Sequence, residues 1–400
     1  MSKNQIAELA EHGLIGLKIE EQRGRTLLCE NKELVDFATT NYLGFDLHPD
    51  INKRGIELAA KWGPIVGWSR LEADAHIYSD LEKSLAKQLG ASNVHLSHSV
   101  TLTGFSLLPW LFNRPTIICD KKVHSVVYEA CRLARDHRAT LVQFEHQDLN
   151  SLEAQLKSAS IAKTPVLVAV DGVYSVSAER APIHELQALC SKYGAWLYID
   201  DAHGFGIFGE SPTANNPYGV GGMGIVKHFT GSYSRTFYVS SFNKAFCTLG
   251  AFLVIPEEYK ENIPSFFLSN IYSAPISPYS LGTLETVLQL NTQIGEIARK
   301  QIRKNVHTLV TGLRNLGLKV SNEATHPVVF VEIGELPDLI RVATDLKNLG
   351  IWAGLRPHPV VPKDQCGMRF AVSAAHSIAD IDKVISAFRE VLTFVKSRAA

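Results

Sequence analysis

The sequence lacks an excess of charge of either sign and any long apolar run. Forty basic residues balance forty acidic ones, so no net positive charge attracts nucleic acid or an anionic membrane. The N-terminal segment MSKNQIAELAEHGLIGLKIEEQRG has the pattern of an amphipathic charged helix, without an apolar block long enough for a signal peptide or a membrane span. We therefore expect a cytoplasmic protein with no membrane span and no nucleic-acid partner.

Motifs for metal and dinucleotide binding are also missing. The six cysteines form no C-x-x-C pair and lie mostly in apolar surroundings, which favours reduced core thiols over disulfides or a zinc site: Cys29, Cys119, Cys131, Cys190, Cys247 and Cys366. Asp200, Asp201 and His203 could begin a metal cluster, but no further ligand has convincing spacing. No G-x-G-x-x-G follows the first strand. We expect no metal, and the case for a dinucleotide is weak.

What is present is a regular alternation of strand-like and helix-like segments. At 46% hydrophobic and 20% charged residues, the chain has the composition of a globular protein with a large core. Between residues 93 and 201, continuously apolar runs such as PTIICD, PVLVAVDG and AWLYIDD alternate with stretches of helical spacing. This repeated β-α-β order predicts a mostly parallel sheet with helices on both faces.

The remainder of the chain suggests a second, smaller unit. A long helix is predicted from Ser280 to Leu313, followed by shorter strands and helices of α+β type. We predict an N-terminal helix and extended segment over residues 1–50, a large domain over 51–285 and a small C-terminal domain over 286–400.

A lone lysine stands between two apolar runs in FYVSSFNKAFCTLGAFLVIP. Lys244 follows the β-rich run Phe237–Val239 and precedes the run Gly250–Ile255. A lysine desolvated in a tight site can lower its pKa and condense with a carbonyl as a Schiff base. On these residues alone, a loop lysine that solvates a turn is the more frequent case.

Polar residues also follow several predicted strands, where open α/β sheets bind their ligands. They are His124 after PTIICD, Ser99 after NVHL, Ser175 after PVLVAVDG, and Asp200 with His203 after AWLYI. Taken singly, each is better explained as a cap or a buried imidazole. Taken together with Lys244, they match the requirements of one cofactor.

That cofactor is pyridoxal phosphate, which needs a lysine, a carboxylate for its ring nitrogen and donors for its phosphate. Lys244 and Asp200 supply the first two, and the predicted helix start at Ser99–Thr101 offers N–H groups to an anion. Ser241 could add a hydroxyl to the phosphate, and His124 could lie flat on the ring.

A series of collinear motifs resembles the α-oxoamine synthase family of pyridoxal-phosphate enzymes, from about Asp36 to Phe388. The motifs are TTNYLGFDLHPD, SRLEADAHIYSDLE, DKKVHSVVYEA, FEHQDLNSLE, DGVYSVSAERAPIHEL, IDDAHGFGIFG, SSFNKAF, YSAPISP, GLRPHPVVP and MRFAVSAAHSIADID. The resemblance implies the fold-type I architecture of aspartate aminotransferase, and a homodimer whose active sites are shared between subunits.

The resemblance also implies roles for individual residues. Lys244 would be the Schiff-base lysine, Asp200 the partner of the ring nitrogen and His124 the residue stacked on the ring. Around the ring hydroxyl and the substrate would lie His203 and Ser175. The phosphate would be held by the Ser99–Val100–Thr101 segment, Ser241 and Ser273 of the partner subunit. Asn41 would lie near the substrate, and Arg369 would bind the carboxylate of the amino acid.

The implied reaction joins an amino acid to an acyl-CoA, with loss of carbon dioxide, to give an α-amino ketone. Departures from the family pattern place the substrate pocket in question: Val100 replaces a glycine, Gly104 an asparagine, Tyr78 a histidine, and Gly250–Ala251 a Gly-Gly pair. VDGVYS and Gly250–Ala251 resemble the α-hydroxyketone autoinducer synthases of quorum sensing, whereas NYLGF resembles serine palmitoyltransferase.

These details favour a medium- or long-chain acyl donor. The alternatives within the family are aminooxononanoate synthase, glycine acetyltransferase and serine palmitoyltransferase. Outside that activity they are an aminotransferase and a non-catalytic partner subunit. The sequence determines neither the amino acid nor the acyl chain.

Overall fold

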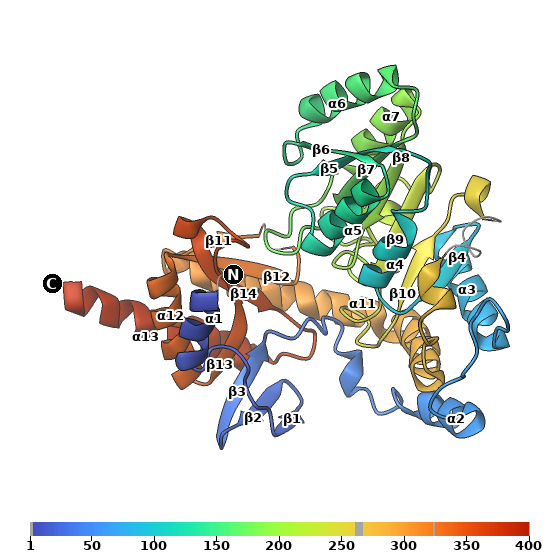
Figure 1. The fold of residues 1–400 in the computed structure, drawn as a ribbon. Helices are drawn as coiled ribbons and strands as arrows, with labels where there is room; N and C mark the ends of the chain where they lie inside the picture. The colour runs from blue at the N-terminus through green and yellow to red at the C-terminus, as the bar shows by residue number, and fades with distance from the viewer. Residues whose placement is uncertain (1–2, 261–266, 323–324, 400) are drawn as a thin grey trace. The chain divides into compact units, whose positions relative to one another are not determined.

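The computed structural model describes residues 3–260, 267–322 and 325–399, which fold into two compact units (Figure 1). One unit, here the N/C unit, combines residues 1–47, 176–178 and 297–400. The other, here the pocket unit, combines residues 48–175 and 179–296. Helix α11 (Pro278–Asn315) contributes its first part to the pocket unit and its second part to the N/C unit.

The pocket unit is built on a seven-stranded sheet in the order β4-β10-β9-β8-β7-β5-β6 (Figure 1). Neighbouring strands are parallel from β9 to β6, whereas β10 is antiparallel to both β9 and β4. The predicted mostly parallel sheet is therefore confirmed. The strands are β4 (Val94–Ser97), β5 (Thr116–Asp120), β6 (Thr140–Phe144), β7 (Val166–Asp171), β8 (Trp196–Asp200), β9 (Thr236–Ser241) and β10 (Ala251–Val254).

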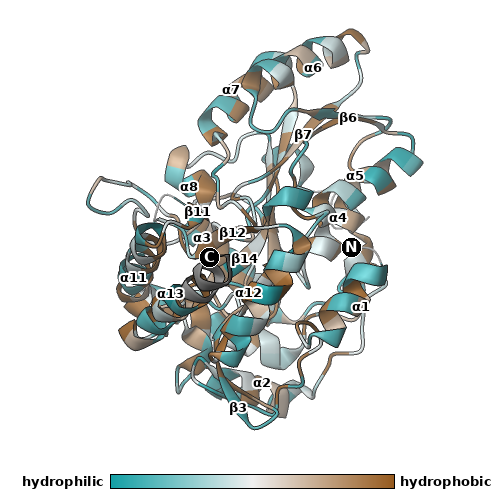
Figure 2. Ribbon diagram, turned by 90° about the vertical axis from the view of Figure 1, so that its left-hand side faces the viewer, coloured by the Kyte–Doolittle hydropathy of each residue, from teal (hydrophilic) through white to brown (hydrophobic). Residues whose placement is uncertain are grey.

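Helices cover this sheet through apolar stripes. In helix α5 the buried residues recur at helical spacing, at Val127, Ala130, Cys131 and Ala134. With apolar residues of α4 they form one core on the face of the sheet that carries Ala169 and Tyr198. Figure 2 shows the resulting mixture of hydrophobic and hydrophilic residues along α5, α6 and α7.

The helices of the pocket unit are α2 (Lys53–Trp62), α3 (His76–Leu89), α4 (Val100–Leu107), α5 (Ser125–Asp136), α6 (Leu149–Ile161), α7 (Ile183–Tyr193), α8 (Ile225–Phe229) and α10 (Leu268–Ile271), with the 3-10 turn η2 (Glu257–Tyr259). None of the helices in the described ranges is long and apolar enough to cross a membrane.

The N/C unit joins the two ends of the chain in a second seven-stranded sheet, ordered β1-β2-β3-β13-β14-β12-β11. The N-terminal strand β3 pairs in parallel with the C-terminal strand β13. The strands are β1 (Glu21–Arg23), β2 (Thr26–Cys29), β3 (Lys32–Phe37), β11 (Lys319–Ser321), β12 (Val328–Gly334), β13 (Ile351–Arg356) and β14 (Cys366–Ala371). The other elements are α1 (Lys3–Glu11), α12 (Leu336–Asn348), α13 (Ile378–Ala399), η1 (Phe45–Leu47) and η3 (Lys363–Gln365).

The N-terminal helix is shorter than its sequence pattern predicts. Helix α1 ends at Glu11, and Gly13 and Gly16 follow with φ angles of 61° and 69°. Glycine adopts this left-handed conformation without steric cost, so the chain turns away from the helix there. The residues that follow form the hairpin of β1 and β2, and the prediction of helix over this stretch is wrong.

A buried histidine should make the stability of the protein depend on pH. His376 stacks on Phe37, with ring centroids 4.0 Å apart, and its Nε2 lies 2.9 Å from the backbone oxygen of Asp36. Burial lowers its pKa to about 4, although the bond to Asp36 opposes the shift. The histidine pKa in the unfolded chain is about 6.5. Between about pH 4 and pH 6.5 this histidine is therefore protonated in the unfolded chain but neutral in the folded chain.

The free energy of unfolding should therefore fall by up to about 3 kcal/mol as the pH decreases through that range. Urea unfolding at neutral pH and at about pH 4.5 measures this change. A His376→Gln variant should be less stable at neutral pH but lose less on acidification. Equal losses in both proteins would contradict this role for His376.

Candidate active site

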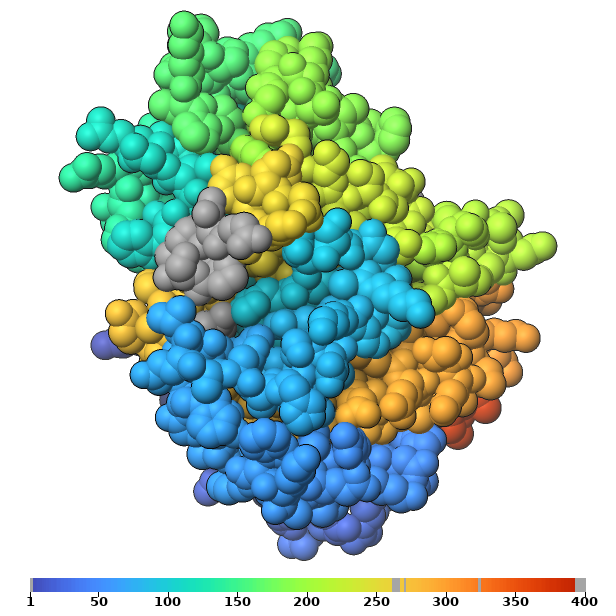
Figure 3. Space-filling view, turned by 90° about the vertical axis from the view of Figure 1, so that its right-hand side faces the viewer, coloured from blue at the N-terminus to red at the C-terminus, as the bar shows by residue number. Residues whose placement is uncertain are grey.

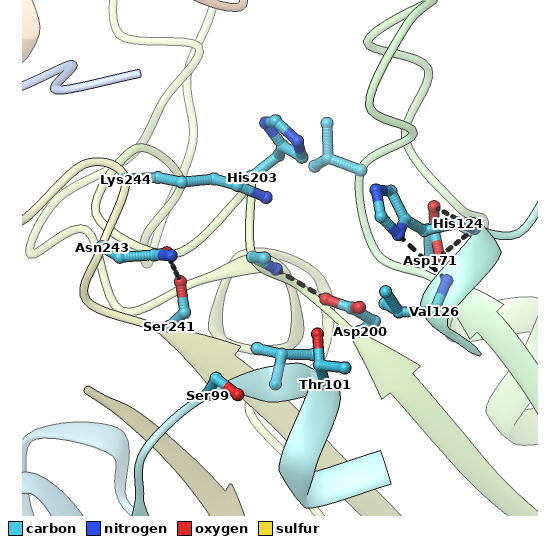
Figure 4. Close-up of a pocket in the computed structure, with 13 residues that line it drawn as sticks. Ser99, Thr101, His124, Val126, Asp171, Asp200, His203, Ser241, Asn243 and Lys244 are labelled. Atoms are coloured by element: carbon cyan, nitrogen blue, oxygen red, sulfur yellow. Dashed lines mark hydrogen bonds between the residues drawn. The ribbon is translucent and has the colours of Figure 1, made fainter. Parts of the chain in front are cut away.

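A cavity at the carboxyl end of the parallel strands brings together most of the residues predicted for the cofactor (Figure 4). The cavity has a volume of about 120 Å³ and opens toward solvent. Its lining comes entirely from the pocket unit: Ser99, Val100, Thr101, His124, Val126, Asp171, Val173, Asp200, Ala202, His203, Ser241, Asn243 and Lys244.

Strand register explains why two acidic residues meet at this edge. Asp171 and Asp200 are the last residues of β7 and β8 and are direct partners in the parallel ladder. Paired positions in neighbouring strands face the same side of a sheet, so both carboxyl groups face the cavity. Asp200 also accepts the backbone N–H of Ala202 at 3.1 Å, which orients its carboxyl group.

The start of helix α4 also lines the cavity. Ser99 is the N-cap residue, and its hydroxyl oxygen accepts the N–H of Leu102 at 3.2 Å. The first N–H groups of a helix have no partner within the helix and attract anions. Such a helix start fits a phosphate group, as the sequence predicts.

The structure explains two departures in this helix from the family pattern. Val100 is buried within the apolar core that α4 shares with α5 and the sheet, so its side chain is accommodated by packing. At Gly104, an added Cβ would lie 3.2 Å from the Tyr198 hydroxyl and 3.4 Å from the Ala130 Cβ. There is little space for an asparagine at that position unless these neighbours move.

A tight turn between β9 and β10 holds Lys244. The backbone N–H of Cys247 donates to the Lys244 carbonyl at 3.1 Å, and that of Thr248 donates to Phe242 at 3.1 Å. The loop after β8 approaches closely, because a Cβ on Gly206 would lie 2.3 Å from that of Ala245. The half-buried Lys244 is thereby held at the cavity wall, as Figure 4 shows.

His124 stands at the start of helix α5. Its Nδ1 accepts the N–H of Val126 at 3.3 Å, so in the neutral ring the proton is on Nε2. Its own backbone N–H donates to both carboxylate oxygens of Asp171, at 3.1 and 3.0 Å. His203, on the loop after β8, is buried and lines the same cavity.

Of the cofactor residues predicted to act within one subunit, all line this cavity except Ser175, whereas Ser273 was predicted to reach the site of the partner subunit. Ser175 follows Val173, which does line the cavity, and the Ser273 hydroxyl donates to the backbone oxygen of Ser269 at 2.7 Å. Asp171 and Asn243 also line the cavity but were not predicted from the sequence. Asp171 ends a strand just as Asp200 does, and that position was the signal that could have identified it.

Of the residues predicted to contact substrate, Asn41 and Arg369 belong to the N/C unit. Arg369 on β14 pairs with Gly354 on the neighbouring strand β13. Arg356 lies two residues after Gly354 on that strand. Partial burial lowers the pKa of both guanidinium groups, that of Arg356 to about 9 with a further contribution from Arg369. Two neighbouring cations of this kind favour an anionic ligand. Arg356, in the GLRP motif, was not selected from the sequence.

Asn41 is held by a buried ion pair. Its Nδ2 donates to the Asp46 carboxylate at 2.9 Å, and the same oxygen accepts from the guanidinium group of Arg25. The Arg25 side chain is 3% exposed and that of Asp46 16%. This bond to Asp46 orients the Asn41 amide group.

Replacing Asp46 with asparagine should lower the free energy of unfolding by about 3–5 kcal/mol, because it leaves the Arg25 charge buried without its anion. Urea unfolding measures this loss. The matched control is Glu21→Gln, which breaks the exposed pair of Glu21 with Arg23 and should leave stability nearly unchanged. Equal stability of the two variants would contradict a structural role for the Arg25–Asp46 pair.

Comparisons with known proteins agree with this geometry. The family model for aminotransferase class I and II matches residues 32–388. The chain belongs to this family. Among its curated relatives, the 8-amino-7-oxononanoate synthase of Herminiimonas arsenicoxydans is 30% identical over 393 residues, covering 96% of this chain and 97% of the relative. That of Dechloromonas aromatica is 30% identical over 396 residues, covering 97% and 98%.

Solved structures of this family share the fold. A serine palmitoyltransferase of S. paucimobilis superimposes with a TM-score of 0.89 at 22% identity, covering 99% of this chain and 98% of the other. That of Sphingomonas wittichii gives 0.87 at 23% identity, covering 97% and 95%. Both named activities are α-oxoamine synthases, so the predicted group is confirmed, together with its fold-type I architecture and its class of pyridoxal-phosphate-dependent acyltransferase.

Proposed function

We propose that this protein condenses an amino acid with an acyl-CoA, releasing carbon dioxide and the thiol, to give an α-amino ketone. The observation that carries the proposal is the single cavity that contains Lys244, Asp200 and the start of helix α4. An amine, a carboxylate and an anion-binding helix start are the groups that pyridoxal phosphate requires, so the residues present fit this cofactor.

When bound, pyridoxal phosphate supplies an electron sink for the bonds at the substrate's α-carbon. Lys244 would anchor the cofactor, and its amine, when free, would accept the substrate's α-proton. Asp200 would keep the ring nitrogen protonated, and His124 would pack on the ring. His203 and Ser175 act around the ring hydroxyl and the substrate. Ser241 and the amides of Val100 and Thr101 hold the phosphate.

The substrate's carboxylate is assigned to Arg369, assisted by Arg356. Both are half-buried and adjacent within the N/C unit, and a guanidinium fork matches a carboxylate in geometry. Asn41, whose amide is oriented by Asp46, offers its oxygen to a donor on the substrate.

The relatives favour a biosynthetic member of the group over an autoinducer synthase. Retrosynthesis of 8-amino-7-oxononanoate gives alanine and a pimeloyl thioester, whereas the serine palmitoyltransferases of the same fold are named for serine and a palmitoyl donor. We propose one of these two pairs as the substrates. The pair of alanine and a pimeloyl thioester matches the relatives at 30% identity. The pair of serine and a palmitoyl donor agrees with the NYLGF motif.

We further propose a homodimer whose sites receive Ser273 of the partner subunit. Figure 3 looks onto a face of the molecule to which the segment with α2 and α3 contributes widely. Apolar side chains in this segment are 50–61% exposed, namely those of Ile56, Ile65 and Leu71. The exposure of these apolar side chains supports the proposal that a second copy of the chain covers this segment.

The proposal is tested by incubating the purified protein and pyridoxal phosphate with a panel of amino acids and acyl-CoAs from acetyl-CoA to palmitoyl-CoA, and following thiol release. Release should require both substrates and be greatest with alanine and pimeloyl-CoA or with serine and palmitoyl-CoA. If no pair releases thiol, the synthase reading fails. Formation of the amino form of the cofactor from an amino acid alone would instead indicate an aminotransferase.

A further inference from the structure

We propose that Asp171 is a positioning residue that fixes His124 against the cofactor cavity. The inference deepens the proposed function and rests on it, since it assumes that the cavity binds pyridoxal phosphate. Asp171 is only 3% exposed and lines the cavity beside Asp200. In this proposal its carboxyl group acts on the cofactor through His124.

The contact between the two residues is specific. Both carboxylate oxygens of Asp171 accept the backbone N–H of His124, at 3.1 and 3.0 Å. On the other side, the His124 ring accepts the N–H of Val126 through Nδ1. The main chain is thus held by β7 and the ring by the first turn of α5, so the imidazole plane has little freedom to tilt (Figure 4).

Asp171 and Asp200, at the ends of neighbouring strands, form different hydrogen bonds. The Asp200 carboxyl group accepts the N–H of Ala202, two residues along its own loop. The Asp171 carboxyl group instead accepts the N–H of His124, which belongs to a different element. Burial and the neighbouring Asp200 raise the pKa of Asp171, opposed by the His124 hydrogen bond and by Lys244. These hydrogen bonds suit Asp200 to contact the cofactor ring and Asp171 to position His124, which stacks on that ring.

Asp120 provides a matched control within the same sheet. It ends the adjacent strand β5 and is fully buried. Like Asp171, it accepts backbone N–H groups after a strand, those of Lys122 at 2.7 Å and Gln147 at 2.9 Å. It does not line the cavity. Removing either carboxyl group takes an acceptor from backbone N–H groups, but only that of Asp171 bonds to His124.

The experiment compares full-length wild type with Asp171→Ala, Asp171→Asn and Asp120→Ala. Two properties are measured on titration with pyridoxal phosphate: the dissociation constant and the visible circular dichroism per bound cofactor, which reports the asymmetry of the ring's surroundings. Urea unfolding without cofactor measures stability separately. If Asp171→Ala does not fold, Asp171→Ser replaces it, because the shorter hydroxyl cannot span the distance to the His124 N–H.

Asp171→Ala should weaken cofactor binding by about tenfold and reduce the dichroism per bound cofactor, because the stacked ring loses its fixed orientation. Asp171→Asn should stay close to wild type, since its amide oxygen still accepts the His124 N–H. Asp120→Ala should lose stability but retain both cofactor properties.

Two results would overturn the inference. One is unchanged dichroism and affinity in Asp171→Ala, or changes no larger than those in Asp120→Ala. The other is an Asp171→Asn variant as impaired as Asp171→Ala, which would show that charge and not the hydrogen bond matters. A wild-type protein that binds no pyridoxal phosphate would instead contradict the proposed function itself.

Discussion

Replacing Lys244 with alanine should reduce turnover by at least about 10³-fold, because the variant loses both the covalent anchor and the proton acceptor at the α-carbon. The cavity would still offer the start of α4 and Asp200, so pyridoxal phosphate should bind weakly and reversibly. Turnover is measured as acyl-CoA-dependent thiol release, and attachment by the visible absorbance of the lysine-linked cofactor.

Lys192→Ala is the control for this variant. Lys192 is exposed and pairs with Glu153 at 2.7 Å, outside the residues that line the cavity. Its removal should leave absorbance and turnover unchanged. Normal lysine-linked absorbance and normal turnover in Lys244→Ala would overturn the assignment of Lys244.

Replacing Asp200 with asparagine should lower kcat by about 10²–10³-fold, because a neutral amide no longer holds the proton on the ring nitrogen. The side chain keeps its size, so the folded structure and the Ala202 hydrogen bond should persist. The measurement is kcat for thiol release, made on cofactor-saturated protein.

The adjacent Asp201 is a control of the same type. It is fully buried and accepts the Tyr238 hydroxyl at 2.7 Å and the Ile225 N–H at 2.8 Å, but it does not line the cavity. Burial raises its pKa to about 7. Asp201→Asn should therefore affect stability more than kcat. If the two variants lose kcat equally, Asp200 has no special role at the ring nitrogen.

Much of the fold was predictable because its signals are local. The apolar strands β5, β7 and β8 alternate with amphipathic helices, and this order alone indicates a parallel sheet. The polar residues at their ends were predictable for the same reason, since parallel strands place their carboxyl ends together.

The rest depends on contacts between distant parts of the chain. The pairing of β3 with β13 joins residues that lie far apart in the sequence, and no local sequence pattern predicts it. The role proposed for Asp171 depends on the backbone N–H of His124, and that of Asp46 on Arg25. A sequence shows which polar residues exist, but such partnerships appear only when the chain is folded.

The most direct test of the account is to locate the cofactor on the chain. The protein is loaded with pyridoxal phosphate, reduced with borohydride, digested and analysed by mass spectrometry for phosphopyridoxyl-lysine. The account predicts one modified position, Lys244, within SSFNKAF. Modification of another lysine, or none despite bound cofactor, would contradict it.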